Sequence, residues 1–272
     1  MQKSKRLLSL PFLFWSSVFI IIPLCMVFYY GLTDKSGSFT LNNVIAITTP
    51  EHLKSLLQAI QLSVISTVLC LLLAYPLAMI LTGIKVKQNS FLILIFILPM
   101  WMNFLLRTLA WQTLLEKTGV INSILHFFHL PGISIINTPG AIILGMVYNF
   151  LPFMVLPIYN VLVKIDKNLI NAARDLGANG VQTFIKVTLP LSLPGVISGI
   201  TMVFVPALTT FVISRLLGGS KILLIGNIIE QEFTQTGNWH LGSGLSIVLM
   251  LFIILNMVIS VVTDQEGDAN AL

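Results

Sequence analysis

The sequence predicts an all-α protein that crosses a membrane several times. Of its 272 residues, 56% are hydrophobic and only 9% are charged, whereas about a quarter of the residues in a soluble domain carry a charge. The mean hydropathy is +0.94. The few charges are also absent from several long stretches of the chain. Together these observations exclude a soluble globular domain and a disordered chain.

The charge-free stretches predict helices and not strands. A helix needs roughly 20 apolar residues to cross the hydrocarbon layer, and a membrane strand would alternate apolar and polar residues over about ten positions. These stretches are instead continuous in Leu, Ile, Val and Phe. We therefore expect six membrane spans, over residues 8–30, 56–82, 89–111, 139–163, 193–215 and 243–263.

The segment before the fourth span is apolar but is not expected to cross the membrane. Residues 118–138 contain Pro131 and Gly132, which interrupt helices. We expect an apolar helix and loop at the outer interface, with a seventh span as the alternative. His126 and His129 are three residues apart, but no acid or Cys lies beside them, so no metal site is predicted.

The basic residues predict the orientation. If the N-terminus is cytoplasmic, nine of the fifteen Lys and Arg lie on the inner side, as the positive-inside rule requires. Six spans then leave both termini in the cytoplasm. The first span could be a signal peptide, but no alanine precedes Ala46 to form a cleavage site, so we expect it to be retained. The inner set is Lys3, Lys5, Arg6, Lys85, Lys87, Lys164, Lys167, Arg174 and Lys186.

One inner loop, residues 164–190, is long and has the pattern of two short helices. Asp166 can cap the first helix, and Gly177 lies where a left-handed residue ends many helices. Asn179 and Gly180 turn the chain, and Pro190 is expected to stop the second helix. The apolar faces consist of Leu169, Ala173 and Leu176, then Val181, Phe184, Ile185 and Thr188. Such a loop either contacts a partner protein or lies on the lipid surface.

The same loop resembles the EAA signature of ABC importer permeases. Asn171-Ala172-Ala173, Gly177 and Val187-Thr188-Leu189-Pro190 match its spacing, with Asn171 in place of Glu and Val187 in place of Ile. The resemblance implies the fold of a type I ABC importer permease and a loop that docks on an ATPase subunit. The coupling residues that it implies are Asn171, Ala172, Ala173, Arg174, Asp175, Gly177 and Pro190.

Three longer segments, 97–111, 149–178 and 216–233, resemble the spermidine/putrescine (PotB-type) permeases. This resemblance implies one permease domain over residues 1–272, with core helices at about 56–263, in a bacterial cytoplasmic membrane. It implies a second PotC-like permease, two PotA-like ATPase subunits and a PotD-like binding protein. ATP and Mg²⁺ would bind the ATPase, since this chain has no GxxxxGK[ST] motif and is not expected to be an enzyme. The alternatives are an ABC permease for another small solute and an ATP-independent secondary carrier.

The expected spans contain no Asp or Glu. Proton-coupled carriers usually place a titratable residue at membrane depth, so the sequence disfavours that class. A polyamine would instead meet aromatic faces through cation–π contacts and carbonyl groups. The candidate path residues are Trp101, Tyr148, Asn149, Phe204 and Phe211, for which packing between helices is the alternative role.

Three acids in the predicted outer loops, Glu116, Glu230 and Glu232, could guide a cation or contact the binding protein. Ordinary solvated loop charges are the alternative. Arg107 lies one turn from Asn103 near the outer end of the third span, where a structural role is favoured.

Two further features of the fifth span concern packing. Gly195 and Gly199 form a GxxxG pattern, which favours close helix contact. Pro206 is expected to kink the span.

Overall fold

The computed structural model describes residues 11–83, 98 and 100–269. These residues are mostly helical and contain no strand, only an isolated β-bridge between Thr33 and Phe39. The all-α prediction is therefore confirmed. The helices are α2 (Ile22–Gly31), α3 (Asn42–Ile45), α4 (Pro50–Gly83), α6 (Phe104–Leu115), α7 (Val120–Phe127), α8 (Pro139–Leu162), α9 (Lys167–Asp175), α10 (Gly180–Thr183), α11 (Leu189–Thr209), α12 (Val212–Leu217), α13 (Ile225–Thr234) and α14 (Trp239–Ala269).

Five helical stretches within the described residues are long and apolar enough to cross a membrane. Each overlaps one of the six predicted spans. The predicted third span, 89–111, lies largely outside the described residues. The five stretches are Pro11–Gly31, Pro50–Gly83, Pro139–Leu162, Gly180–Thr209 and Trp239–Ser260.

The described end of the predicted third span is interrupted. The helix breaks at Met102 and Asn103, and α6 begins at Phe104. The Asn103 side chain accepts hydrogen bonds from the backbone N–H groups of Leu105 at 2.9 Å and Leu106 at 3.3 Å. It therefore caps a new helix, and the prediction of one unbroken helix to residue 111 is wrong. The next helix, α7, has only eight residues, which agrees with the prediction that 118–138 is not a span.

The fifth span differs from the prediction at both ends. One helical stretch runs from Gly180 to Thr209, and α12 follows as a separate short helix after a break. The prediction that Pro190 ends a helix is therefore wrong. A π-helical turn, Phe184–Thr188, precedes Pro190, which falls in the first turn of α11. The helix continues through Pro190, which has no N–H to donate, and the π-helical turn is a local irregularity of the kind that accommodates the missing hydrogen bond.

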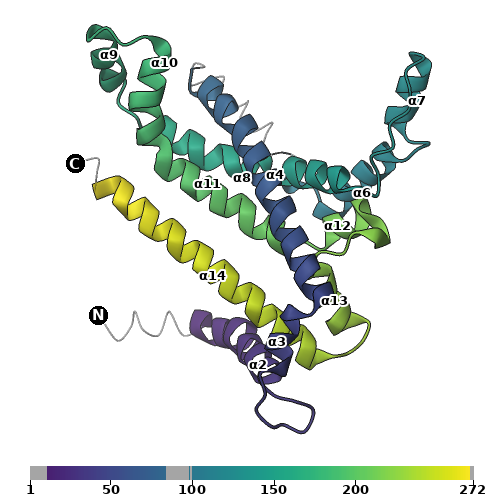
Figure 1. Cartoon of the computed structure of the whole chain (residues 1–272). Coiled ribbons are helices and arrows are strands. Elements are labelled where there is room, and N and C mark those ends of the chain that lie inside the picture. Colours follow the sequence, from purple (N-terminus) through teal and green to yellow (C-terminus); the bar gives the residue numbers. More distant parts are fainter. Residues whose placement is uncertain (1–10, 84–97, 99, 270–272) are drawn as a thin grey trace. The chain divides into compact units, whose positions relative to one another are not determined.

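The chain divides into two compact units. The first combines residues up to Ser55 with Ile228–Ile254, and the second combines Leu56–Asn227 with the residues from Leu255 onward. In the second unit α8 and α11 pack side by side, and the α9–α10 hairpin extends beyond one end of this pair (Figure 1). The prediction of a single permease domain stays a prediction.

The contact between α8 and α11 depends on two glycines, as the GxxxG pattern predicts. A Cβ atom on Gly195 would lie 2.9 Å from the Pro157 carbonyl oxygen and 3.1 Å from Ile158 Cα. A Cβ atom on Gly199 would lie 2.7 Å from Met154 Sδ. Without Cβ atoms the two backbones approach closely, which supplies dispersion contacts where the hydrophobic effect between helices is absent.

In the second unit α4 buries small residues and exposes large ones. Ala74 and Ala78 are fully buried, whereas Leu72 and Ile80 are more than half exposed. The buried face also contacts α8, because Ser66 Oγ donates a hydrogen bond to Met146 Sδ at 3.3 Å. This inside-out distribution is typical of a helix that faces lipid on one side.

Candidate coupling site and translocation path

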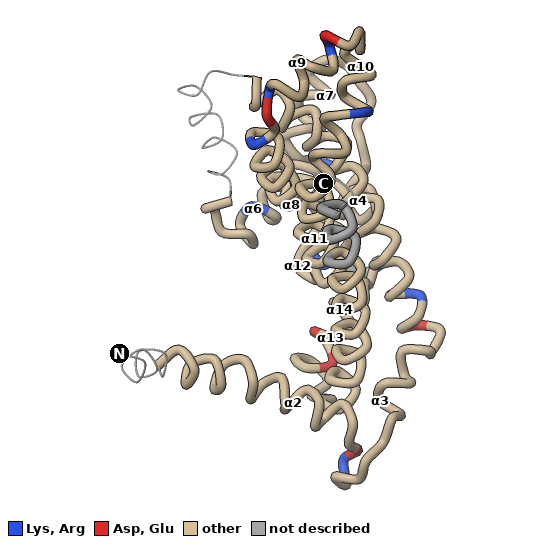
Figure 2. The backbone as a smooth tube through the Cα atoms, turned by 90° about the vertical axis from the view of Figure 1, so that its left-hand side faces the viewer, with Lys and Arg blue, Asp and Glu red and all other residues tan. Residues whose placement is uncertain are grey.

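The α9–α10 hairpin collects most of the charges at its end of the second unit. Figure 2 shows coloured charged residues at α9 and α10, whereas α8 and α11 carry none. A charge-free helix pair can lie in hydrocarbon, and its charged end must lie at the water boundary. The charged residues of this end are Lys164, Asp166, Lys167, Arg174, Asp175 and Lys186, all of them exposed.

The first helix of the hairpin has a defined start. The Asp166 side chain accepts a hydrogen bond from the Asn168 N–H at 2.9 Å, which makes Asp166 the predicted N-cap. Its negative charge also faces the positive end of the helix dipole. The start of α9 is thus fixed by a local signal in the sequence.

The end of α9 is a Schellman motif around Gly177. The Gly177 N–H donates to the Arg174 carbonyl at 2.9 Å, and the Ala178 N–H donates to the Ala173 carbonyl at 3.0 Å. Gly177 has a φ of 84°, in the left-handed region where a side chain is unfavourable. The predicted role of Gly177 as the residue that ends the helix and turns the chain is confirmed.

The second helix starts with a reciprocal capping box. The Gln182 N–H donates to Asn179 Oδ1 at 2.9 Å, and the Asn179 N–H donates to Gln182 Oε1 at 3.0 Å. Two backbone N–H groups that would otherwise lack a partner are satisfied in this way. The hairpin is therefore built by its own caps at Asp166, Gly177 and Asn179.

The hairpin leaves several apolar side chains uncovered. Leu176 is 90% exposed and Val181 is 66% exposed, and Leu169 and Ile185 are about half exposed. Both sides of the turn thus present apolar groups, although the backbone geometry is well satisfied. Exposed apolar groups on a defined scaffold are typical of a contact surface for another molecule. Of the motif residues, Asn171, Ala172, Arg174, Asp175, Gly177 and Pro190 are exposed and Ala173 is half-buried.

A cavity of about 190 Å³ lies between the hairpin and the ends of two spans. Met79 and Thr82 come from α4, Leu162 from the end of α8, and Arg174 and Phe184 from the hairpin. This side of the hairpin is therefore not tightly packed against the spans.

One buried polar contact connects the spans beside this cavity. The Tyr75 hydroxyl on α4 lies 2.6 Å from Ser192 Oγ on α11, and the Tyr75 ring meets the Phe184 ring edge-to-face, with centroids 5.5 Å apart. Tyr75 and Ser192 were not among the residues predicted from the sequence, because the contact between them depends on the packing of two helices. A Ser in an apolar run was the available signal.

The predicted path residues fall into two groups. Trp101 is 77% exposed and Phe211 is 39% exposed, whereas Phe204 and Asn149 are buried within the chain. The Asn149 amide nitrogen donates to the Gly145 carbonyl at 2.8 Å, and its Oδ1 has no hydrogen-bond partner among the described residues. Trp101, Phe211 and Tyr148, which is 38% exposed, are thus the members of the set that lie at the surface of the chain.

Tyr148 already has a cationic neighbour. The Arg107 guanidinium carbon lies 5.8 Å from the centre of the Tyr148 ring, and Trp111 packs edge-to-face against the same ring at 5.1 Å. Arg107 is buried, so the guanidinium stabilises the contact between α6 and α8. A substrate ammonium group would have to share this ring with Arg107.

The three predicted outer acids are placed differently. Glu116 is exposed at the end of α6. The Glu230 carboxylate accepts a hydrogen bond from Thr234 Oγ1 at 3.2 Å, and the Glu232 carboxylate accepts one from Thr236 Oγ1 at 2.9 Å. The carboxylates of Glu230 and Glu232 therefore each accept a hydrogen bond from a threonine hydroxyl four residues later in the chain.

A buried polar network at the break after α11 was also missed. Asn227 Oδ1 accepts from Ser214 Oγ at 2.6 Å and from the Leu224 N–H at 3.1 Å, and Asn227 Nδ2 donates to the Phe211 carbonyl at 2.9 Å. Asn227 thereby satisfies a backbone carbonyl where the helix is interrupted.

Within the described residues no cluster of three or more His, Cys, Asp or Glu could hold a metal ion.

Five long apolar helical stretches and one structured, exposed hairpin, among the residues that the structure describes, are typical of a multi-pass membrane protein. The family model for the inner membrane component of binding-protein-dependent transport systems matches residues 3–265. The chain belongs to this family.

Curated relatives with high similarity are named as polyamine permeases. The spermidine/putrescine transport system permease protein PotB of Haemophilus influenzae is 37% identical over 89% of this chain and 87% of its own length. PotB of Escherichia coli K12 is 36% identical over 90% of this chain and 92% of its own length. The inner membrane ABC transporter permease protein YdcU of the same organism is 29% identical over 84% of this chain and 78% of its own length.

Solved structures share the fold. A chain of a bacterial alginate ABC transporter, in complex with its alginate-bound periplasmic protein, matches with a TM-score of 0.78 and 15% identity, over 94% of this chain and 91% of that chain. A chain of the MetNI methionine ABC transporter matches with a TM-score of 0.57 and 17% identity, over 79% and 95%. The fold is therefore that of a type I ABC importer permease.

Proposed function

We propose that this chain is the transmembrane permease subunit of an ATP-driven importer for polyamines such as spermidine and putrescine. The observation that carries the substrate class is the 36–37% identity, over about nine tenths of the chain, to permeases named for these two polyamines. An external binding protein would deliver the substrate, and the chain would provide part of the path into the cytoplasm.

The coupling role is supported by the α9–α10 hairpin. Its caps fix the backbone, and Leu176 and Val181 are left exposed at the turn. An ATPase subunit that covered these side chains would bury apolar surface at little cost in ordering, since the hairpin is already structured. Asn171 replaces the motif Glu, and an amide can still donate and accept hydrogen bonds there.

An ATP-driven cycle is supported by the absence of acids from the apolar parts of the spans. No Asp or Glu occurs in residues 56–82, 139–163, 193–215 or 243–263, so a proton-coupled cycle would have no carboxylate at membrane depth. ATP and Mg²⁺ would bind two ATPase subunits, and a second, PotC-like permease would complete the membrane part. Both termini of this chain would lie in the cytoplasm, where nine of its fifteen basic residues would then also lie.

The test is uptake by proteoliposomes that contain this chain with a PotC-like permease, a PotA-like ATPase and a PotD-like binding protein from the same organism. We expect labelled spermidine to enter only with internal ATP and the external binding protein. ATP-dependent uptake of a different solute, with no uptake of spermidine or putrescine, would agree with an ABC importer permease but would contradict the assignment of polyamines as the substrate. Polyamine uptake driven by a proton gradient without ATP would overturn the importer assignment.

A further inference from the structure

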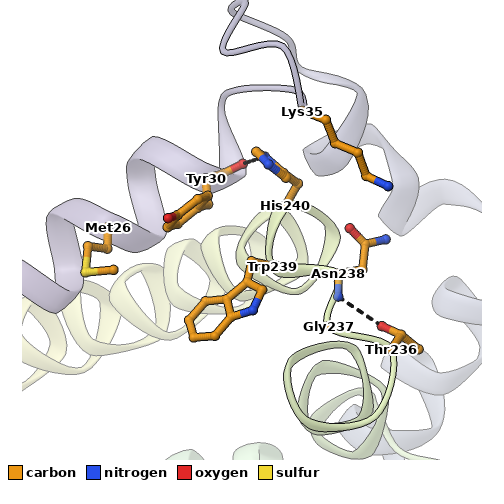
Figure 3. A pocket seen from close by; sticks show the side chains of 8 residues that line it. All are labelled: Met26, Tyr30, Lys35, Thr236, Gly237, Asn238, Trp239 and His240. Atoms are coloured by element: carbon orange, nitrogen blue, oxygen red, sulfur yellow. Dashed lines mark hydrogen bonds between the residues drawn. The ribbon is translucent and has the colours of Figure 1, made fainter.

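The first unit contains an open cavity of about 670 Å³ at the end of α2. Its lining comes from α2, the loop after it, the turn before α14 and the first two residues of α14, and the side chains face one space (Figure 3). This volume is large enough for a small organic ligand. The lining residues are Met26, Tyr30, Lys35, Thr236, Gly237, Asn238, Trp239 and His240.

The cavity lies where two apolar helices end together. The stretch Pro11–Gly31 ends beside it, and the stretch Trp239–Ser260 begins in it. The rings of Tyr30 and Trp239 have centroids 6.1 Å apart, and Trp239 is half exposed. Tyr and Trp gather where helices leave the hydrocarbon, at the level of the lipid headgroups. The cavity therefore opens at the membrane–water interface.

The lining changes from apolar to polar along the helix axis. Met26 lies one helical turn before Tyr30, toward the middle of the apolar stretch, whereas Lys35 and Asn238 lie beyond the helix ends. In Figure 3 Met26 lies on one side of the aromatic pair and Lys35 with Asn238 on the other. A phospholipid has the same order of groups, since its acyl chains lead through the glycerol to the phosphate.

The carbonyl groups at the end of α2 already have partners. His240 Nδ1 is 3.0 Å from the Tyr30 carbonyl oxygen and 2.7 Å from the Thr33 carbonyl oxygen, so it donates to both. Asn43 Nδ2 also donates to the Thr33 carbonyl at 2.9 Å. The helix end therefore does not offer free carbonyls to a cation, and the bonded His240 ring is held in place.

Lys35 supplies a positively charged group to the lining of the cavity. Lys35 is the formally charged member of the lining at neutral pH, and no Asp or Glu belongs to it. The two acids nearest in sequence have other partners. Asp34 accepts from the Ser36 and Ser38 N–H groups, at 2.9 and 3.0 Å, and Glu232 accepts from Thr236. Lys35, the Trp239 indole N–H and the Asn238 amide can thus all act as donors to an anionic group.

We propose that this cavity binds one phospholipid, with its phosphate at Lys35 and Asn238, its glycerol region between Tyr30 and Trp239, and its acyl chains past Met26. A carboxylate from a partner protein would satisfy Lys35 but would leave Met26 and the aromatic faces at the helix ends without a role. The lipid accounts for the charge, the aromatic pair and the apolar end together. This inference goes beyond the transport function and does not depend on the substrate.

The test is native mass spectrometry of the assembled transport complex, titrated with a short-chain phosphatidylglycerol. We expect one tightly retained phosphatidylglycerol on this chain and no equivalent retention of a diacylglycerol with the same acyl chains. Lys35→Gln should weaken phosphatidylglycerol binding by about five-fold or more, because a charge-assisted hydrogen bond is lost. Lys35→Arg should restore most of the binding, since it keeps the charge.

The matched control is Lys221→Gln, which removes an exposed lysine that does not line the cavity and should leave lipid binding unchanged. Equal retention of diacylglycerol, or unchanged phosphatidylglycerol binding in Lys35→Gln, would overturn the proposal. If Lys35→Gln spared lipid binding and weakened only the association of the external binding protein, the cavity would be a protein contact and the lipid site would be rejected.

Discussion

The hydroxyl of Tyr75 on α4 lies 2.6 Å from Ser192 Oγ on α11, although the two residues are 117 positions apart in the sequence. Ser192 Oγ also donates to the Leu189 carbonyl at 2.9 Å, so Tyr75 is the natural donor to Ser192. This hydrogen bond connects α4 with α11, the helix that continues from the α9–α10 hairpin.

Removal of the Tyr75 hydroxyl should loosen this connection. We expect Tyr75→Phe to lower the free energy of unfolding by about 1 kcal/mol, because a buried hydrogen bond is lost while the ring still packs on Phe184. A double-mutant cycle with Ser192→Ala, measured by denaturant unfolding in mixed micelles, should give a coupling energy of about 0.5–1.5 kcal/mol. Additive effects would show that the two hydroxyls do not interact. Tyr29→Phe, at an exposed position, is the control.

A side chain at Gly177 should disrupt the α9–α10 hairpin. Since Gly177 has a φ of 84°, Gly177→Val should cost about 1–2 kcal/mol locally and distort the turn that presents Leu176. We expect ATP-dependent uptake to fall at least ten-fold while the protein remains in the membrane. Gly180→Ala is the matched control, because Gly180 has no positive φ and an alanine Cβ at this position would point into open space. Normal uptake by Gly177→Val would contradict the coupling role.

A substitution at the exposed Leu176 should affect ATPase binding without affecting the stability of the chain. At 90% exposure it contributes little to the stability of the chain, so Leu176→Ser should leave thermal unfolding unchanged. If an ATPase covers it, the same change should weaken ATPase binding about five-fold, which corresponds to roughly 1 kcal/mol. Binding can be measured by biolayer interferometry in detergent. Leu130→Ser, an exposed leucine after α7, should leave ATPase binding unaltered, and equal behaviour of the two variants would contradict docking at the hairpin.

The hairpin could be predicted from sequence because its signals are local. Asp166 and Asn179 cap the helices that follow them, and Gly177 ends the helix before it. Each acts on residues within one turn, so a single segment contains all the information. Leu176 directly precedes Gly177, so it lies at the turn that Gly177 makes.

The break at Asn103 and the continuation past Pro190 could not be predicted in the same way. Hydropathy indicates which residues can lie in lipid, but it does not show where a helix is interrupted. Because the residues on both sides of Asn103 are apolar, the hydropathy pattern gave no sign that Asn103 caps a new helix. At Pro190 the expectation that a proline ends a helix was wrong, because the chain enters α11 through a π-helical turn that precedes the proline. The contact of Tyr75 with Ser192 depends on tertiary packing, which no local pattern encodes.

The two glycines of α11 should differ in their tolerance of alanine. At Gly195 a Cβ atom would meet the Pro157 carbonyl oxygen and Ile158 Cα, which are backbone atoms, whereas at Gly199 the first obstacle is the flexible Met154 side chain. We therefore expect Gly195→Ala to cost about 1–3 kcal/mol and Gly199→Ala to cost less. Unfolding of the two variants under identical conditions checks the order. The reverse order would show that α8 and α11 are not in this contact.

Asn227 should be the most sensitive polar residue of the break after α11. Asn227→Ala leaves Ser214 Oγ, the Leu224 N–H and the Phe211 carbonyl without the bonds that Asn227 makes, and Asn227 is only 2% exposed. Since a buried polar group without a partner costs about 1–3 kcal/mol, we expect a loss of about 2–4 kcal/mol in unfolding free energy. Asn160→Ala, at an exposed position of α8, should change stability by less than about 0.5 kcal/mol. Ser214→Ala removes one hydroxyl and leaves the bonds of Asn227 to the Leu224 N–H and the Phe211 carbonyl in place. It should therefore cost less than Asn227→Ala, and a larger cost for Ser214→Ala would place the centre of this network at Ser214.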